Sequence, residues 1–156
     1  MEELMKPGGL NQIAEVELIY KSKVKASERP KISHSRDAYV IFKGNWDENK
    51  IELQEQFKVM LLNRANKVLG IYEVSTGGMT GTVADPRLIF AAALKTSATS
   101  IMLVHNHPSG NLKPSKQDEE LTYKIKEGAK LLDIVLLDHL IISNEGYLSM
   151  QDEGFI

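Results

Sequence analysis

The chain has 156 residues, a length that fits one domain with its own core, and its hydrophobic fraction of 42% and charged fraction of 26% are ordinary for a globular protein. A formal net charge of -2 argues against a protein that binds nucleic acid mainly by charge, and the lack of cysteine excludes disulfides, thiolate metal ligands and a cysteine nucleophile. The N-terminal stretch "MEELMKPGGLNQIAEVE" has no apolar segment, so we expect no signal peptide, no membrane span and a cytoplasmic location.

The first 32 residues are expected to form an arm followed by a strand. Residues 1–12 hold the breaker "KPGG", and Val16, Leu18 and Tyr20 alternate in "EVELIYKSKVK", which predicts a strand. Five basic residues lie around it: Lys21, Lys23, Lys25, Arg29 and Lys31. We interpret them as a solvated strand face, with weak contact to nucleic acid or to an acidic partner as the alternative.

A helix and a hairpin are expected next. "SHSRDAYVIFKGNWDENK" predicts a helix that Ser33 or Ser35 caps and that ends near Gly44. "EQFKVMLLNRANKVLGIYEVS" predicts two strands joined by a turn at "NRAN". The glycine-rich "GGMTGTV" lacks the lysine and the spacing of a phosphate-binding loop, so we expect flexible backbone there.

The second half alternates helices with strands. Asp85 and Pro86 predict the start of a helix in "ADPRLIFAAALKTSA", and the short apolar "TSIMLV" predicts a central strand. A second helix is expected in "SKQDEELTYKIKEGAKLLD", then strands in "IVLLDHLIIS" and "GYLSM". The apolar stripe of that second helix would be Leu121, Ile125, Ala129 and Leu132. The fold class is therefore α/β, with helices on both faces of a sheet.

A candidate metal site lies in "LVHNHPSGNLKPSKQD". His105 and His107 are two positions apart at the end of the central strand, so their side chains should project together from its carboxyl end. A tight loop then leads to Asp118, in the first turn of the next helix. Two imidazoles and one carboxylate leave a fourth position for water, which is the pattern of catalytic zinc sites.

The same residues allow a reading without metal. Ser115 and Asp118 match the Ser-x-x-acid pattern that caps a helix, and a single histidine after a strand is more often structural. Two histidines on one side next to a carboxylate are costly to bury unless they are hydrogen-bonded or bind a metal ion, so a metal site remains one of the two interpretations. Asn106 should point to the opposite side of the strand end.

These residues resemble the JAMM motif of the JAB/MPN metalloprotease superfamily, His-x-His followed after ten intervening residues by Asp. The chain is most similar to the RadC-like branch, which has a His-Asn-His-Pro-Ser-Gly signature, a Pro-Ser-x-x-Asp and an Asp-His pair before a strand. Residues 105–110, residues 114–118 and the pair Asp138-His139 match these three elements. Pro86-Arg87 fits a further family feature. The contiguous His-Asn-His is not the pattern of the HNH nucleases, whose named residues are spread over a ββα-metal unit.

The resemblance covers about residues 33–156 and implies a mixed, curved β-sheet flanked by helices, the JAB/MPN (cytidine deaminase-like) architecture. We therefore expect an N-terminal arm and strand over residues 1–32 and a RadC-like JAB/MPN domain over residues 33–156. Many RadC-like proteins carry a helix-hairpin-helix segment at the N-terminus, and the predicted strand stands in that place here.

The resemblance also implies residue roles. Zn²⁺ would be bound by His105, His107 and Asp118, and a glutamate from an upstream strand would act as general base and acid. Glu55 is preferred over Glu52 and Glu73, because it shares the presumed inward face of its strand and stands two residues before an aromatic residue. A strand-edge acid facing water is the alternative for Glu55, with Glu73 held in reserve.

Three further residues are candidates for supporting roles. Ser115 would stabilise the oxyanion formed during hydrolysis, although capping the helix is its simpler role. Asp138 and His139 are candidates for contacts behind the metal ligands, and a histidine inside "LLDHLII" is more often such a residue than a ligand.

Three functions are compatible with this pattern. The first is a zinc-dependent hydrolase that cleaves a peptide or isopeptide bond in a peptide or protein substrate. The second is a nucleic-acid-associated factor, as the historical link of the RadC-like group with DNA repair suggests. The third is a non-catalytic interaction domain, although such members of the superfamily have usually lost motif residues that are present here.

Overall fold

The structure is a computed structural model that describes residues 12–77 and 84–156. The start of the expected arm and most of the glycine-rich loop lie outside the described residues, so those expectations stay predictions. The helices are η3 (Ala26–Glu28), α1 (Ser35–Gly44), α2 (Pro86–Lys95) and α3 (Lys116–Leu131). The strands are β1 (Gln56–Leu62), β2 (Val68–Thr76), β3 (Ser100–Asn106), β4 (Val135–Ile142) and β5 (Tyr147–Ser149).

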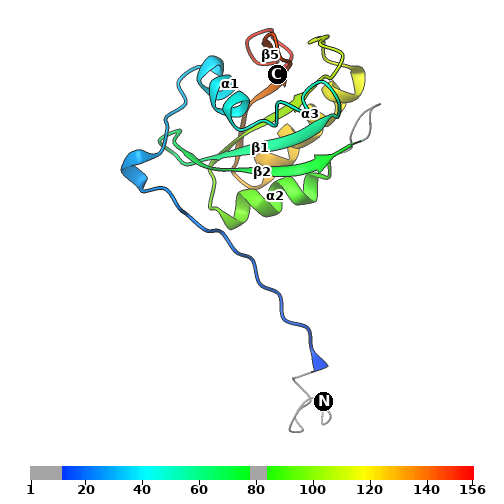
Figure 1. Ribbon diagram of the computed structural model, residues 1–156. Helices are drawn as coiled ribbons and strands as arrows, with labels where there is room; N and C mark the ends of the chain where they lie inside the picture. The colour runs from blue at the N-terminus through cyan, green and yellow to red at the C-terminus, as the bar shows by residue number, and fades with distance from the viewer. Residues whose placement is uncertain (1–11, 78–83) are drawn as a thin grey trace.

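The five strands form one mixed sheet in the order β2-β1-β3-β4-β5. Figure 1 shows β2 and β1 in front. The β1–β2 hairpin is antiparallel, as the sequence predicted, and β1 also pairs antiparallel with β3. β3 and β4 are parallel and are joined through α3, whereas β5 returns antiparallel to β4. β3 is the central strand, and all of its residues are buried.

Helices cover both faces of the sheet, which confirms the predicted α/β class. One face packs against α2 and α3, and Figure 1 shows these two helices on the same side of the strands. The other face packs against α1, through Ala38 and Phe42. Burial of apolar side chains in these two layers supplies the main favourable free energy of the fold and fixes β3 in the sheet between β1 and β4.

The starts of α2 and α3 follow the predicted capping chemistry. The Asp85 carboxylate accepts a hydrogen bond from the backbone N–H of Arg87 at 2.9 Å, and Pro86 occupies the first turn. α1 differs from the prediction, because its N-cap is His34 and neither Ser33 nor Ser35. There the Asp37 carboxylate accepts the backbone N–H groups of Ser33 and His34. This acid in the first turn therefore supplies the cap that a serine was expected to supply.

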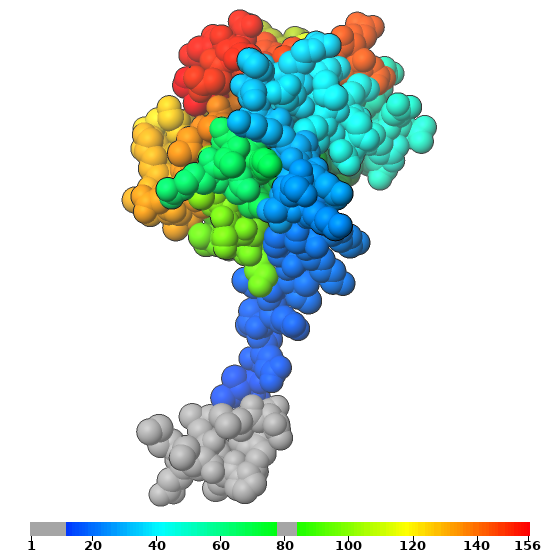
Figure 2. Space-filling model, turned by 90° about the vertical axis from the view of Figure 1, so that its left-hand side faces the viewer, coloured from blue at the N-terminus to red at the C-terminus, as the bar shows by residue number. Residues whose placement is uncertain are grey.

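The expected strand in residues 15–25 is wrong, because no backbone ladder forms in that segment. The segment runs extended away from the sheet, as the blue trace in Figures 1 and 2 shows. Val16 is 88% exposed, and the Tyr20 hydroxyl donates a hydrogen bond to the carbonyl of Leu69 at 2.6 Å, which ties the segment to β2 by a side chain. Among the described residues, no helix has both the length and the apolar character needed to cross a membrane.

Candidate metal centre

Four side chains from three separate parts of the chain meet at the carboxyl end of β3. Glu55, His105, His107 and Asp118 each offer one ligand atom, and these atoms all lie within 4.8 Å of one another. The Nε2 atoms of His105 and His107 are 2.9 Å apart. Asp118 Oδ1 lies 3.3 Å from His105 Nε2, and Asp118 Oδ2 lies 3.3 Å from His107 Nε2. Glu55 Oε1 lies 3.6 Å from His105 Nε2.

The local sequence explains why β3 presents its histidine to this cluster. His105 is paired directly with Phe57 on β1, and the two rings stack with centroids 5.8 Å apart. The neighbouring Asn106 points the other way, as alternation in a strand requires. Its side chain accepts the N–H of Gln56 and donates to the carbonyls of Ile51 and Gln54. Asn106 therefore closes the backbone around the start of β1, and it is not part of the cluster.

The helix cap positions Asp118. Ser115 Oγ accepts the backbone N–H of Asp118 at 3.0 Å, and Asp118 Oδ2 accepts the backbone N–H of Ser115 at 2.8 Å. This reciprocal pair is a capping box. The same carboxylate also faces both histidines, so the cap and the candidate ligand are one side chain. The two readings of the sequence are therefore compatible.

The hydrogen bonding of His107 makes the cluster suited to a cation. Its Nδ1 atom lies 2.6 Å from the carbonyl oxygen of Asn111, which can only accept, so Nδ1 carries a proton. When the ring is neutral, Nε2 then has a free lone pair directed at His105 and at the carboxylates. Two carboxylates and a bare imidazole nitrogen at these distances repel one another unless a positive charge lies between them.

The electrostatic environment in the metal-free chain agrees with this reading. Burial acts to raise the pKa of Asp118, but the neighbouring His105 and His107 outweigh it and hold that pKa well below 3.8. Burial acts to lower the pKa of His107, but its hydrogen bonds to Asp118 and to the Asn111 carbonyl raise it above 6.5. Below the raised pKa of His107, a proton lies where a metal ion would bind and competes with it.

The cluster has a closed side and an open side. The side chain of His105 is only 1% exposed, whereas those of Glu55, Asp118 and His107 are 14%, 15% and 18% exposed. A ligand bound among the four residues would therefore be fixed from within and remain reachable from the solvent side. Structural zinc sites are closed and catalytic sites keep an open position, so this arrangement suits the catalytic kind.

The structure separates the three candidate glutamates. Glu55 lies in the cluster, directly before β1. Glu73 accepts hydrogen bonds from the side chains of Gln56 and Thr76, and Glu52 accepts one from Asn144. Within residues 12–77 and 84–156, only Glu55 of these three belongs to the cluster of ligand atoms.

His139 lies behind His105, on the side away from the solvent. Its Nε2 atom is 2.8 Å from Nδ1 of His105, and its Nδ1 atom is 2.6 Å from the hydroxyl of Thr122. The ring is fully buried against Phe57, with centroids 5.5 Å apart. Sequence reasoning missed Thr122, although it stands four residues after Asp118 and therefore on the same face of α3.

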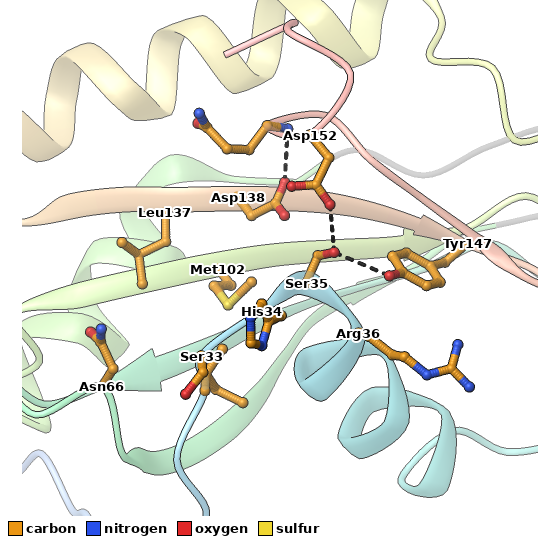
Figure 3. Close-up of a pocket in the computed structure, with 12 residues that line it drawn as sticks. Ser33, His34, Ser35, Arg36, Asn66, Met102, Leu137, Asp138, Tyr147 and Asp152 are labelled. Atoms are coloured by element: carbon orange, nitrogen blue, oxygen red, sulfur yellow. Dashed lines mark hydrogen bonds between the residues drawn. The ribbon is translucent and has the colours of Figure 1, made fainter.

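Asp138 is not near the cluster, because alternation along β4 turns it to the opposite face of the sheet. Its carboxylate accepts the backbone N–H groups of His139 and Gln151 and the hydroxyl of Ser149. Figure 3 shows Asp138 beside Asp152 in a pocket under α1, with Met102 of β3 and Leu137 nearby. Of the two residues expected behind the candidate ligands, His139 lies beside His105, whereas Asp138 lies on the opposite face of the sheet.

Comparison with known proteins shows the family of the chain. A sequence model of the RadC-like JAB domain matches residues 32–155. The chain belongs to the RadC-like JAB domain family. Its mixed sheet with helices on both faces agrees with a JAB/MPN domain, as the sequence predicted.

Several proteins that bear the name UPF0758 protein are similar to the chain. One from Flavobacterium johnsoniae is 44% identical over 124 residues, covering 80% of this chain and 53% of that protein. One from Methanosarcina mazei is 40% identical over 126 residues, covering 81% and 54%. One from Clostridium kluyveri is 38% identical over 144 residues, covering 92% and 61%. The chain thus spans about half the length of the curated relatives it matches.

Proposed function

We propose that this RadC-like domain is a zinc-dependent hydrolase of the JAMM type that cleaves a peptide or isopeptide bond. The observation that carries the proposal is the convergence of Glu55, His105, His107 and Asp118, whose ligand atoms lie within 4.8 Å of one another. Imidazole and carboxylate groups suit zinc, and the partly exposed side of the cluster leaves room for a water molecule and a substrate.

The roles of the residues follow from their positions. His105, His107 and Asp118 would hold the ion, whose chemical contribution is to lower the pKa of a water molecule and to polarise a carbonyl group. Glu55 would take the proton from the attacking water and deliver it to the leaving amine, because its carboxylate faces the ligands from the solvent side. Ser115 would donate its hydroxyl proton to the developing oxyanion while its oxygen continues to accept the N–H of Asp118.

The test is cleavage of a peptide library that includes isopeptide-linked substrates, using zinc-loaded protein. Glu55→Gln should lower the cleavage rate by about 10²–10⁴-fold while the bound zinc is retained, since a glutamine amide cannot take a proton from water and pass it on as a carboxylate can. Glu73→Gln is the matched control, because that side chain bonds to Gln56 and Thr76 outside the cluster. Wild-type rates in Glu55→Gln, or no cleavage of any substrate by fully loaded protein, would contradict the proposal.

A second candidate function is association with nucleic acid, supported by the exposed basic residues on the extended segment. Lys21, Lys23 and Lys25 are all exposed to solvent in this segment. Binding that weakens steeply with salt and is lost when these three lysines are neutralised would support this function. Binding that is insensitive to both changes would exclude the segment as the contact.

A further inference from the structure

Two buried polar side chains behind the cluster have no part in the proposed reaction. His139 is 0% exposed and Thr122 is 3% exposed, and both lie on the inner side of His105. They form a continuous chain of short contacts: His105 Nδ1 to His139 Nε2 at 2.8 Å, and His139 Nδ1 to Thr122 Oγ1 at 2.6 Å. This series of contacts ends at the backbone carbonyl oxygen of Asp118, which lies 2.6 Å from the same Oγ1 atom.

The Asp118 carbonyl at the end of this series fixes which group donates in each of its hydrogen bonds. The carbonyl of Asp118 has no proton, so Thr122 must donate to it. The threonine hydroxyl has one proton only, and that proton is now used. At 2.6 Å the contact between Thr122 and His139 therefore needs a proton from the ring, which places the proton of His139 on Nδ1.

The same reasoning continues to His105. His139 is 0% exposed, and its two ring nitrogens contact only the His105 ring and the Thr122 hydroxyl, so no carboxylate offsets a positive charge there and the ring is neutral. A neutral ring has one N–H, so Nε2 of His139 accepts and Nδ1 of His105 donates. When the His105 ring carries one proton, that proton is therefore on Nδ1, and Nε2, the atom that faces Asp118 and Glu55, has a free lone pair.

We propose that Thr122 and His139 are positioning residues that hold His105 in the tautomer with a free Nε2 lone pair. The opposite direction would make Thr122 donate to His139 and would leave two oxygens 2.6 Å apart with no proton between them. It would also place a proton on His105 Nε2, where the proton would compete with a metal ion. Asp118 thus acts twice: its carboxylate faces the cluster, and its carbonyl sets the tautomer of the neighbouring ligand.

The tautomer can be measured without metal, substrate or activity. Nitrogen-15 NMR of the metal-free protein, at a pH above the raised pKa of His107, reports which ring nitrogen carries each proton. We expect His105 and His139 both to be protonated on Nδ1 alone. A proton on Nε2 of His105 or of His139 in the wild-type protein would overturn the proposal. Because it needs no variant, this measurement does not depend on how any substitution folds.

Two variants test the role of Thr122. Thr122→Val keeps the shape and removes the hydroxyl, whereas Thr122→Ser keeps the hydroxyl. Where the proposed metal function holds, zinc affinity should fall about tenfold to hundredfold in Thr122→Val and stay close to wild type in Thr122→Ser. In the metal-free valine variant, the NMR signals should show a proton shifted towards Nε2 of His105.

The outcomes separate this inference from the proposed function. Equal zinc affinity and unchanged tautomers in Thr122→Val would overturn the positioning role while leaving the metal site intact. Failure of the wild-type protein to bind zinc would instead contradict the hydrolase proposal, and the tautomers of His105 and His139 would still decide the positioning role. Thermal unfolding of both variants checks that each is folded under the conditions of the comparison.

Discussion

The Nε2 atoms of His105 and His107 face each other at 2.9 Å, and the Asp118 carboxylate lies 3.3 Å from both. Neutral imidazoles placed this way direct two lone pairs at one point, and the carboxylate adds negative charge there. A cation at that point, either a metal ion or a proton, relieves the repulsion and stabilises the arrangement.

Removal of one ligand should abolish tight metal binding with little effect on the fold. His107→Ala should weaken zinc binding by more than about a hundredfold. The loss of a residue that only hydrogen-bonds to a ligand costs at most about that much, so a larger effect marks a direct ligand. His34→Ala is the control, because the His34 side chain is 82% exposed and lies in the cap of α1. Isothermal titration of zinc into metal-free protein measures both. Equal affinities in the two variants would show that His107 is not a ligand.

Replacement of Asn106 should have the opposite pattern. Its buried side chain accepts one hydrogen bond from Gln56 and donates to the carbonyls of Ile51 and Gln54, so Asn106→Ala leaves buried backbone groups without partners. We expect a loss of about 2–5 kcal/mol in the free energy of unfolding, measured with urea. The folded fraction should still bind zinc with the wild-type stoichiometry. A stable variant that binds no zinc would contradict this assignment.

The metal-free protein should lose stability as pH rises through the folded-state pKa of His107. This pKa is raised above 6.5, so the interactions of the imidazolium with Asp118 and the Asn111 carbonyl stabilise the folded state fully below pH 6.5. As pH rises through the raised folded-state pKa, the ring loses the proton on Nε2 and with it the attraction to Asp118, while the hydrogen bond from Nδ1 to the Asn111 carbonyl remains and loses only its charge. The stability difference between wild type and His107→Gln should therefore shrink from pH 6 towards alkaline pH, by urea unfolding at a series of pH values. A difference that grows with pH would have the wrong sign.

Asp138→Asn should affect stability and leave zinc binding unchanged. Asp138 accepts hydrogen bonds from Ser149 and from the backbone of Gln151 on the face opposite the cluster. Burial also raises its pKa, despite these hydrogen bonds. We expect a change of about 1–3 kcal/mol in unfolding free energy and a zinc affinity equal to that of the wild type. A large loss of zinc affinity in the folded variant would show that Asp138 acts on the cluster through the sheet.

The alternation of β-strands explains both what the sequence predicted at the site and one error. It correctly placed His105 apart from Asn106, because adjacent side chains in a strand point to opposite faces. The same rule separates Asp138 from His139 on β4, yet the sequence similarity grouped them as a pair. Position in a motif shows that residues occur together, whereas strand parity shows which of them can meet.

Other differences arose from interactions that a local pattern does not contain. The alternation of Val16, Leu18 and Tyr20 predicted a strand, but a strand needs backbone hydrogen bonds to a neighbouring strand, and residues 15–25 form no such ladder. On α3 the expected apolar stripe included Leu132, which is 41% exposed beyond the helix end, and omitted the buried Thr122. A polar residue can belong to a buried face when its partner comes from a distant strand, here His139 on β4.

The measurement that tests the central claim most directly is the zinc content of the folded chain. Metal-free protein supplied with zinc, then freed of excess ion and analysed by mass spectrometry and titration, should contain about one zinc ion per chain. The double variant His105→Ala, His107→Ala should contain none while the exposed-histidine variant His34→Ala keeps it. A well-folded wild-type chain that takes up no zinc, or the same amount as the double variant, would contradict the metal centre.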